Sequence, residues 1–293
     1  MKKINITASR HAVFYSPLLA MINGNFLEEE DLKGIYHKPN ENINIYEKIK
    51  SNEIDVAQSA VSGSWNLLKK NPESTIKHFA SINSRDGFFI ISKNLEQFKW
   101  NDLYKDPFYY VKGGQPEAML SYALSKKNIN IFEIPNVSNE SLSTPEMIYR
   151  YKKEKKGFFH EQGAYPHELG RENQGKIIKS IGEIIGPVAF SSLCAEEKWI
   201  KSEDGKKVSR AFEKAKKWVN TSDPIDIGKL IKNHFETFSL ESITEAIKDY
   251  QVLKTWDSGI EISDQEYDKS LDVFEHSQLI SKRYPMNKVV IYS

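Results

Sequence analysis

Residues 4–18 read INITASRHAVFYSPL and contain the unit from which the rest of the fold can be argued. Alternating apolar residues over 3–8 predict a β-strand. Ser16-Pro17 is typical of a helix start, because a capping hydroxyl precedes a proline in the first turn. Residues 9–15 then form a polar and aromatic turn at the carboxyl end of the strand, which is where α/β sheets bind their ligands.

The alternation of strands and helices continues along the chain. Further strands are predicted at 34–37, 54–57, 76–82, 88–92, 109–111, 130–134, 157–161, 176–181 and 187–191. Further helices are predicted at 42–52, 62–70, 117–126, 143–154, 195–201, 206–220, 224–234, 239–254 and 264–277. Because a βαβ order implies right-handed crossovers, we expect an α/β fold in which mainly parallel sheets are flanked by helices.

Two lobes are expected from the length and from two connecting strands. A chain of 293 residues exceeds the usual size of one domain, and no Pro/Gly-rich linker interrupts it. The strand segment at 86–92 would lead out of the first lobe, and the one at 186–192 would lead back. We therefore expect a discontinuous lobe one at 1–88 and 189–293 with a C-terminal helical cap, a lobe two at 89–188, and a cleft between them.

Composition excludes several classes of protein. The 41 Lys and Arg against 40 Asp and Glu give a net charge of +1, without the basic footprint of a nucleic-acid-binding protein. The single cysteine, Cys194, cannot form an internal disulfide and rules out multi-cysteine metal sites. The sequence contains no run of about 18 apolar residues, so no transmembrane helix is predicted. We expect a monomer.

The first residues bear on where the protein works. Met1-Lys2-Lys3 is followed directly by the first predicted strand, without the apolar segment of a signal peptide. The chain as written therefore predicts a cytoplasmic protein, or a periplasmic or extracytoplasmic one if a native signal was removed.

The turn at 9–15 carries the first group of candidate ligand contacts. Ser9 offers a hydroxyl, and Arg10 offers a rigid fork of donors suited to carboxylate, sulfonate or phosphate. His11 can donate, accept or titrate near neutrality. Phe14 and Tyr15 could stack on a flat ring. The structural alternative is that Phe14 belongs to the core and that Arg10 pairs with a surface acid.

A second turn, at 58–62, precedes the helix predicted at 62–70. The free N–H groups of a helix start form a site for an anion or a carbonyl oxygen. Gln58, Ser59 and Ser62 are therefore candidate ligand contacts, while the two serines are also ordinary capping residues.

A third turn contains Gly113, Gly114 and Gln115 before Pro116. Glycines let the backbone approach a ligand closely, and the following helix start again offers donors. The alternative is a simple tight turn. No Gly-Lys-Ser/Thr follows, so this is not a P-loop.

The richest polar segment is 160–168, at the end of a strand predicted in lobe two. His160 and Glu161 are candidates there, and Glu161 would receive a donor such as an amine or ring N–H. The spacing of histidines and glutamates does not match His-Glu-x-x-His, so no metal site is expected. Arg85 is a weaker candidate before the connecting strand, and Asp86 would cap or pair with it.

These stretches together resemble the type II periplasmic substrate-binding proteins, in the branch that covers nitrate, sulfonate, taurine and thiamine-pyrimidine binding proteins. The resemblance rests on their order along nearly the whole chain, in segments 9–18, 24–29, 55–59, 112–120, 181–193 and 216–220. It implies a two-lobed fold, a ligand between the lobes and an ABC permease as partner. It also implies that the loop at 160–168 faces the cleft.

The function expected from this resemblance is the capture of a small polar ligand, flat or anionic, without a cofactor. The alternative is a cytoplasmic enzyme on the same fold. Thiamine pyrimidine synthases use pyridoxal phosphate, iron and a cysteine-rich segment, whereas this chain has one cysteine. Desulfinases of this fold carry a cysteine in the first-strand turn, where this chain has Ser9-Arg10-His11. A hydrolytic role stays open, because fold does not fix function.

Overall fold

The computed structural model describes residues 1–39, 44–94, 97–135, 142–257 and 259–292. Its strands are β1 (Lys2–Ala8), β2 (Leu32–His37), β3 (Val56–Ser59), β4 (Ile76–Asn83), β5 (Phe88–Ser92), β6 (Phe108–Tyr110), β7 (Phe158–Gln162), β8 (Lys176–Ser180) and β9 (Ser191–Glu196). Its α-helices are α1 (Ser16–Asn23), α2 (Ile45–Lys50), α3 (Val61–Lys70), α4 (Gly114–Ser125), α5 (Thr144–Lys153), α6 (Tyr165–Arg171), α7 (Ile181–Ile185), α8 (Glu197–Ile200), α9 (Glu203–Thr221), α10 (Pro224–Ile231), α11 (Leu240–Val252) and α12 (Asp264–His276). Short 3-10 helices are η1 (Val13–Tyr15), η2 (Glu28–Glu30), η3 (Trp100–Tyr104), η4 (Ile131–Glu133), η5 (Lys232–His234) and η6 (Met286–Lys288).

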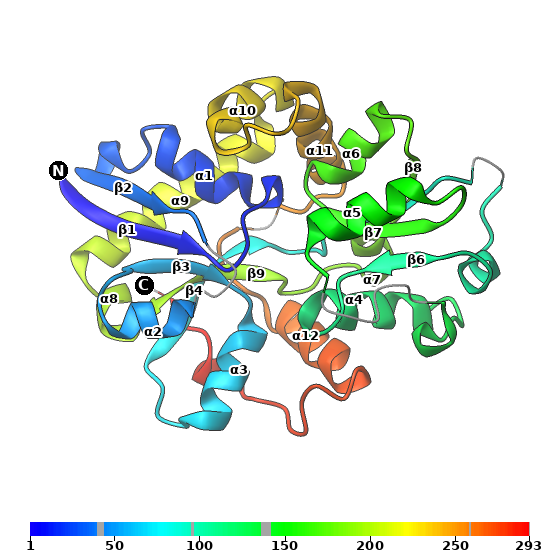
Figure 1. Ribbon diagram of the computed structural model, residues 1–293. Coiled ribbons are helices and arrows are strands. Elements are labelled where there is room, and N and C mark those ends of the chain that lie inside the picture. The colour runs from blue at the N-terminus through cyan, green and yellow to red at the C-terminus, as the bar shows by residue number, and fades with distance from the viewer. Residues whose placement is uncertain (40–43, 95–96, 136–141, 258, 293) are drawn as a thin grey trace.

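The strands form two separate sheets, which Figure 1 shows side by side. The first has the order β2-β1-β3-β9-β4, and the second has the order β6-β7-β5-β8. In the first sheet β9 runs against its neighbours β3 and β4, while the other strands share one direction. In the second sheet β5 alone, among the strands described, runs against the rest. The expected α/β fold with mainly parallel sheets is confirmed, and the opposed strands are the two that follow a crossing between sheets.

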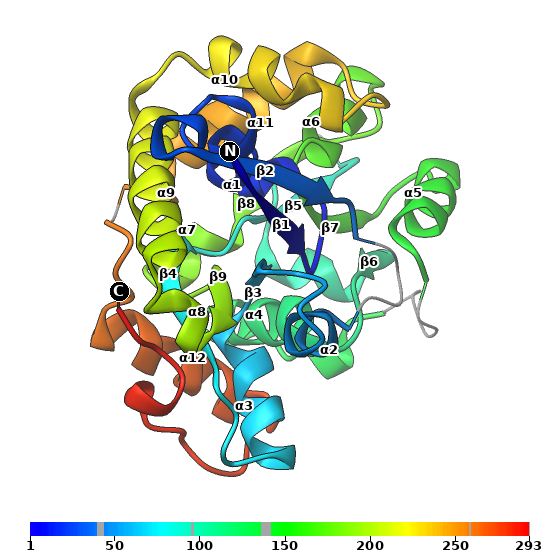
Figure 2. The same ribbon diagram turned by 90° about the vertical axis from the view of Figure 1, so that its left-hand side faces the viewer.

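Helices cover both faces of the first sheet because neighbouring strand residues point to opposite sides. Val56 belongs to the large core cluster that includes α1 and α9 residues, and the next residue, Ala57, belongs to a smaller cluster with Ile45 and Ile49 of α2. Figure 2 shows α9 along one side of this sheet and α2 on another.

The second sheet is covered in the same way. Ile90 and Phe158 lie in the large cluster with residues of α4, whereas Ile91 and Phe159 pack with Met147 of α5 on the other face. The C-terminal helices reach this half of the molecule, since α11 packs on α6 and α12 on α4. The residue boundaries of the two lobes stay a prediction.

Two strands expected from the sequence are wrong. The segment 130–134 contains η4, because the Asn130 side chain accepts a hydrogen bond from the Phe132 N–H and closes a turn. The return strand is β9 at 191–196 and not 187–191, because the backbone of 188–190 hydrogen-bonds outside a ladder, to Ser84, Glu266 and Asn83. The expected helix at 42–52 appears as α2, with residues 42 and 43 outside the described residues.

Candidate functional site

The turn after β1 lies against the end of β7, so the two sheets meet there. Both segments contain ligand contacts predicted from the sequence. A Cβ placed on Gly163 would be 3.7 Å from the Val13 nitrogen and 3.8 Å from the Ala12 Cβ. In Figure 1 the carboxyl end of β1 points toward the second sheet. We call the side chains gathered here the junction site. They are Arg10, Tyr15, Asp86, His160, Glu161 and Gln162.

Arg10 and Glu161 form the charged contact of the junction site. An Arg10 Nη2 N–H donates to Glu161 Oε1 at 2.6 Å, and the guanidinium lies 5.4 Å from the centre of the Phe88 ring. The Glu161 side chain is fully buried, whereas 30% of the Arg10 side chain is exposed. The sequence named both residues but could not pair them, because 151 positions separate them. The structural alternative predicted that Arg10 pairs with a surface acid. Its partner is instead Glu161, a buried acid on the second sheet.

Thr144 completes the contacts of Glu161 and was missed from the sequence. Its Oγ1 donates to Glu161 Oε2 at 2.8 Å, and the Gln162 backbone N–H donates to Oε1 at 2.8 Å. Thr144 is the first residue of α5, and its neighbour Ser143 forms the predicted capping box with Glu146. The capping box predicted the start of this helix, and it was the only sequence signal that could have indicated a polar contact at Thr144.

His160 is fully buried on β7, yet neither ring nitrogen has a hydrogen-bond partner within the described part of the chain. Its ring stacks on Phe88, with centroids 4.6 Å apart and planes at 20°. Burial, helped by the charge of Arg10, lowers the pKa of His160 to about 3. The ring is therefore neutral near pH 7 and offers one N–H donor and one nitrogen acceptor.

Asp86 is a second fully buried polar group of this kind. Its Oδ1 accepts from the Phe88 N–H at 2.7 Å, and its Oδ2 has no partner among the described residues. Burial raises the pKa of Asp86 to about 8, against the lowering effect of that hydrogen bond. Asp86 caps the chain locally, as the sequence suggested, but does not pair with Arg85.

Tyr15 and Gln162 are the remaining polar residues of the junction site. The Gln162 side chain hydrogen-bonds to Tyr15, and burial raises the pKa of Tyr15 to about 12. The Gln162 Oε1 atom has no partner in the described structure. Because the two ends of an amide can be exchanged, either orientation leaves one of its polar atoms beside Tyr15 and the other unpartnered.

Phe14 is fully buried and packs edge-on against Phe190 and close to Tyr250, with ring centroids 5.2 and 4.8 Å apart. Gly87 makes room for it, since a Cβ there would lie 2.3 Å from the ring. The structure thus places Phe14 in the core, as the structural alternative had it.

Ser9 and Gln58 join the ends of β1 and β3. The Ser9 hydroxyl and backbone N–H donate to Gln58 Oε1 at 2.9 and 3.0 Å. Ser59 shares a hydrogen bond of 2.8 Å with the Tyr46 hydroxyl, and Ser62 lies buried in the first turn of α3. The Ser9–Gln58 contact joins the ends of β1 and β3, and contact with a ligand stays a prediction for all four residues.

His11 is occupied on both sides of its ring. Nε2 lies 2.9 Å from the His234 carbonyl oxygen, so Nε2 carries the proton. Nδ1 then accepts from the Tyr36 hydroxyl at 2.9 Å, and the ring stacks on Phe235 with centroids 4.6 Å apart. Burial lowers the pKa of His11. The side chain faces the C-terminal helical region and not Glu161.

The glycine turn starts α4. Gly113 and Gly114 have φ of 80° and 64°, and the Gly113 N–H donates to Glu117 Oε2 at 2.6 Å. The Gln115 amide donates to the Phe190 carbonyl at 2.9 Å, which ties α4 to the return segment. A carboxylate therefore already lies at this helix start.

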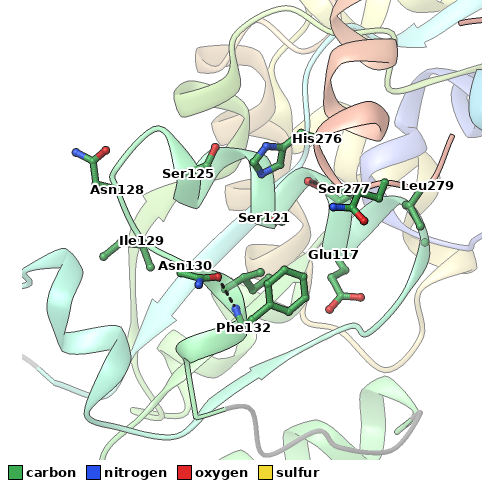
Figure 3. Close-up of a pocket in the computed structure, with 14 residues that line it drawn as sticks. Glu117, Ser121, Ser125, Asn128, Ile129, Asn130, Phe132, His276, Ser277 and Leu279 are labelled. Carbon is green, nitrogen blue, oxygen red and sulfur yellow. Dashed lines mark hydrogen bonds between the residues drawn. The ribbon is translucent and has the colours of Figure 1, made fainter. Parts of the chain in front are cut away.

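Arg85 lies apart from these groups. Its guanidinium is 3.5 Å from the Gly182 carbonyl, and it lines a cavity of about 480 Å³ with Lys179 and Asp249. A cavity of about 680 Å³ lies elsewhere, between α4 and the end of α12 (Figure 3). Of the predicted residues, it includes Gly114 alone.

Groups that could serve catalysis lie in the first sheet and in α3, which packs against it. Ser64 Oγ and Ser192 Oγ are 2.9 and 2.7 Å from the two ring nitrogens of His78, and all three residues are buried. Cys194, opposite His78 in the ladder, is fully buried, and burial raises the pKa of its thiol. A substrate has no access to a nucleophile in this position.

The described residues contain no group of three or more His, Cys, Asp or Glu side chains placed to hold a metal ion. No helix among them is long and apolar enough to span a membrane.

Comparisons with known proteins show which fold this is. No family model matches the chain. YtlA of Bacillus subtilis (strain 168), named as a binding protein, is 23% identical over 304 residues, covering 99% of this chain and 88% of YtlA. The alkanesulfonate-binding protein SsuA of Xanthomonas axonopodis pv. citri, bound to MOPS, aligns with a TM-score of 0.73 at 13% identity, over 100% of this chain and 99% of SsuA. SsuA of Escherichia coli, a periplasmic aliphatic sulphonate binding protein, aligns with a TM-score of 0.75 at 11% identity, over 99% and 92%. The chain has the type II periplasmic binding protein fold that these structures share.

Proposed function

We propose that this chain is a solute-binding protein of the ABC-transporter type, which captures a small polar ligand between the turn at 9–15 and the end of β7. The observation that carries the proposal is a set of buried polar atoms at the junction site, on Asp86, His160 and Gln162, which have no partner among the residues that the structure describes. Buried polar atoms are normally hydrogen-bonded. A group of unpaired ones where two lobes meet is expected when a bound molecule supplies the missing partners.

The similarity in fold supports this proposal, because the aligned SsuA proteins bind sulfonates and cover the same length of chain. Binding free energy from a ligand that contacts both sheets favours the closed arrangement of the lobes. An ABC permease would be the partner that receives the ligand. No cofactor is needed for this function.

The enzymatic alternative lacks a supporting observation. The buried Ser64–His78–Ser192 contact and the buried Cys194 are structural in their surroundings. Pyridoxal phosphate belongs to that alternative alone.

The proposal is tested by thermal unfolding of the purified protein in the presence of fractions of a bacterial metabolite extract. A ligand present at about 100 times its Kd stabilises the folded state by roughly 2.7 kcal/mol. For a chain of this size, that raises Tm by roughly 5 °C. We expect at least one fraction to produce such a shift, and mass spectrometry of the bound molecule then identifies it.

The control is His160→Leu. Leucine fills the same space without polar atoms, so the fold should keep its stability or gain some. The shift should be lost. If no fraction shifts Tm of the unchanged protein, or if His160→Leu responds equally, the junction site is not a ligand site.

A further inference from the structure

The C-terminal end of α5 carries a cluster of positive charge that the junction site does not use. Residues 150–156 read RYKKEKK and hold five basic side chains and one acid, a net charge of +4. The whole chain carries +1, so the other residues together carry a net charge of −3. The positive charge of this segment is therefore a local feature and not a property of the whole surface.

Lysines from other elements extend this cluster around two adjoining cavities, of about 430 and 480 Å³, which share Lys93 and Lys155. Lys93 donates to the carbonyl oxygens of Lys152 and Glu154 at 3.0 and 2.7 Å and so caps the end of α5. We call this surface the basic face, and it consists of Lys93, Lys105, Arg150, Lys152, Lys153, Lys155, Lys156 and Lys176.

The carboxylates beside the basic face already have partners, which are Lys105 for Asp102, Lys152 for Glu172, the Asn94 amide for Asp106 and the Tyr109 hydroxyl for Glu154. Lys155, Lys156 and Lys176 are exposed and form no ion pair with a carboxylate of the described residues. Their charges therefore remain available to an anionic partner.

An exposed aromatic ring borders the basic face. Tyr149 is 62% exposed, and the Lys153 Nζ lies 3.9 Å from the centre of its ring. Tyrosine is typical of membrane–water interfaces, where its ring lies among the lipid headgroups. Clusters of Lys and Arg on one face bind anionic lipids. Figure 2 shows α5 at the side of the molecule, clear of the first sheet, where an extended surface can reach it.

We propose that the basic face binds the surface of a membrane that contains anionic phospholipids, with lipid phosphates among its lysines and Tyr149 among the headgroups. A dissolved anion would make no use of an exposed ring, so the lipid surface is the partner that fits both features. The net negative charge of the remaining residues orients the basic face toward the membrane. This inference goes beyond the proposed function and does not depend on which solute is bound.

The test is co-sedimentation of the purified chain with two kinds of vesicle, phosphatidylcholine alone and equal parts of phosphatidylcholine and phosphatidylglycerol. We expect binding to the mixed vesicles only. Binding should weaken between ionic strengths of about 0.01 and 0.15 M, because the Debye length falls from about 30 to about 8 Å. Absence of binding to the mixed vesicles at the lower ionic strength overturns the proposal.

Two sets of variants locate the contact. Replacing Lys155, Lys156 and Lys176 together by Gln should lower the partition constant for the mixed vesicles roughly 100-fold. Replacing them by Arg keeps the charge and should preserve binding. The control replaces three exposed lysines of α2 and α3 by Gln, namely Lys50, Lys69 and Lys70, and should bind as the unchanged protein does.

Thermal unfolding checks that each variant keeps the Tm of the unchanged protein, as expected for exposed positions. An equal loss of vesicle binding in both Gln variants would mean that net charge and not this face is responsible, which overturns the proposal. A further arm adds inorganic tripolyphosphate without lipid. A rise in Tm that depends on Lys155, Lys156 and Lys176, without vesicle binding, would assign the basic face to a dissolved polyanion and also overturn the proposal.

Discussion

At the scale of single residues, Asp86 is the side chain whose environment departs most from its setting in the sequence. It follows Arg85 in a stretch that leads from one sheet to the next. Its carboxyl is nevertheless fully buried, and one of its two oxygens has no partner among the described residues. A buried acid without a cation beside it favours its protonated form. Its titration therefore couples to folding.

The stability of the protein should fall as pH rises through the titration range of Asp86. The carboxyl has an ordinary pKa of 3.8 in the unfolded chain and a pKa of about 8 in the folded one. Between these values the folded state binds a proton that the unfolded state has released, so this group contributes a loss of about 1.4 kcal/mol per pH unit. Asp86→Asn removes the effect, and its gain in Tm over the unchanged protein should be larger at pH 8 than at pH 5.

The measurement is thermal unfolding of both proteins across pH 5 to 8 without ligand. Asp226→Asn, at an exposed position in the first turn of α10, is the control and should show a difference that does not change with pH. A gain for Asp86→Asn that is the same at every pH would show that Asp86 is already ionised in the folded protein.

At the scale of secondary-structure elements, the start of α4 depends on the backbone conformation of one glycine. Gly113 has φ 80° and ψ 163°, a region that residues with a Cβ atom rarely occupy. Its N–H donates to the Glu117 carboxylate, and Gln115, two residues on, donates to the Phe190 carbonyl. The glycine thus sets the direction from which α4 approaches the return segment.

Gly113→Ala should lower the free energy of unfolding by about 2 kcal/mol through backbone strain. Steric contact is not the cause, because a Cβ at Gly113 meets nothing within 4 Å. Gly170→Ala is the matched control, since Gly170 lies within α6 without a positive φ and a Cβ there would meet only the Gly175 carbonyl oxygen at 3.7 Å. It should be neutral or slightly stabilising. Urea unfolding measures both, and equal effects of the two variants would refute the strain argument.

At the scale of the whole molecule, contacts at the junction site hold the two sheets together in the absence of ligand. The Arg10–Glu161 pair joins the turn after β1 to β7. The Tyr250 hydroxyl joins α11 to the ends of β7 and β5 in the second sheet, since it accepts from the Gly163 N–H at 2.7 Å and donates to the Gly87 carbonyl at 3.0 Å. The balance between open and closed forms should respond to the loss of either link.

Arg10→Met should shift the ligand-free protein toward the open form, because it removes the charged link and leaves buried Glu161 without its cation. Small-angle X-ray scattering should report a larger radius of gyration. Lys152→Met removes an equivalent charge from a pair with Glu172, which joins α5 to the end of α6 on one side of the junction, and should leave the radius unchanged. Identical radii for Arg10→Met and the unchanged protein would show that the pair does not influence closure.

Much of this architecture follows from local patterns in the sequence. Period-two alternation marked β1, and continuous apolar runs marked the buried strands β4 and β5. The Ser143 and Ser263 capping boxes marked α5 and α12, because backbone conformation responds to near neighbours. The same patterns placed Arg10, His160 and Glu161 at strand ends.

The sequence by itself therefore determined the order of strands and helices and the turns that carry polar groups. The tertiary structure alone decided which of those groups meet. Arg10 finds its partner 151 residues away and His11 finds one 223 residues away, so no local pattern encodes either choice. It also decided that residues 187–190 stay outside the ladder and that Asp86 lies buried with one oxygen unpartnered among the described residues, because both depend on how the two sheets pack against each other.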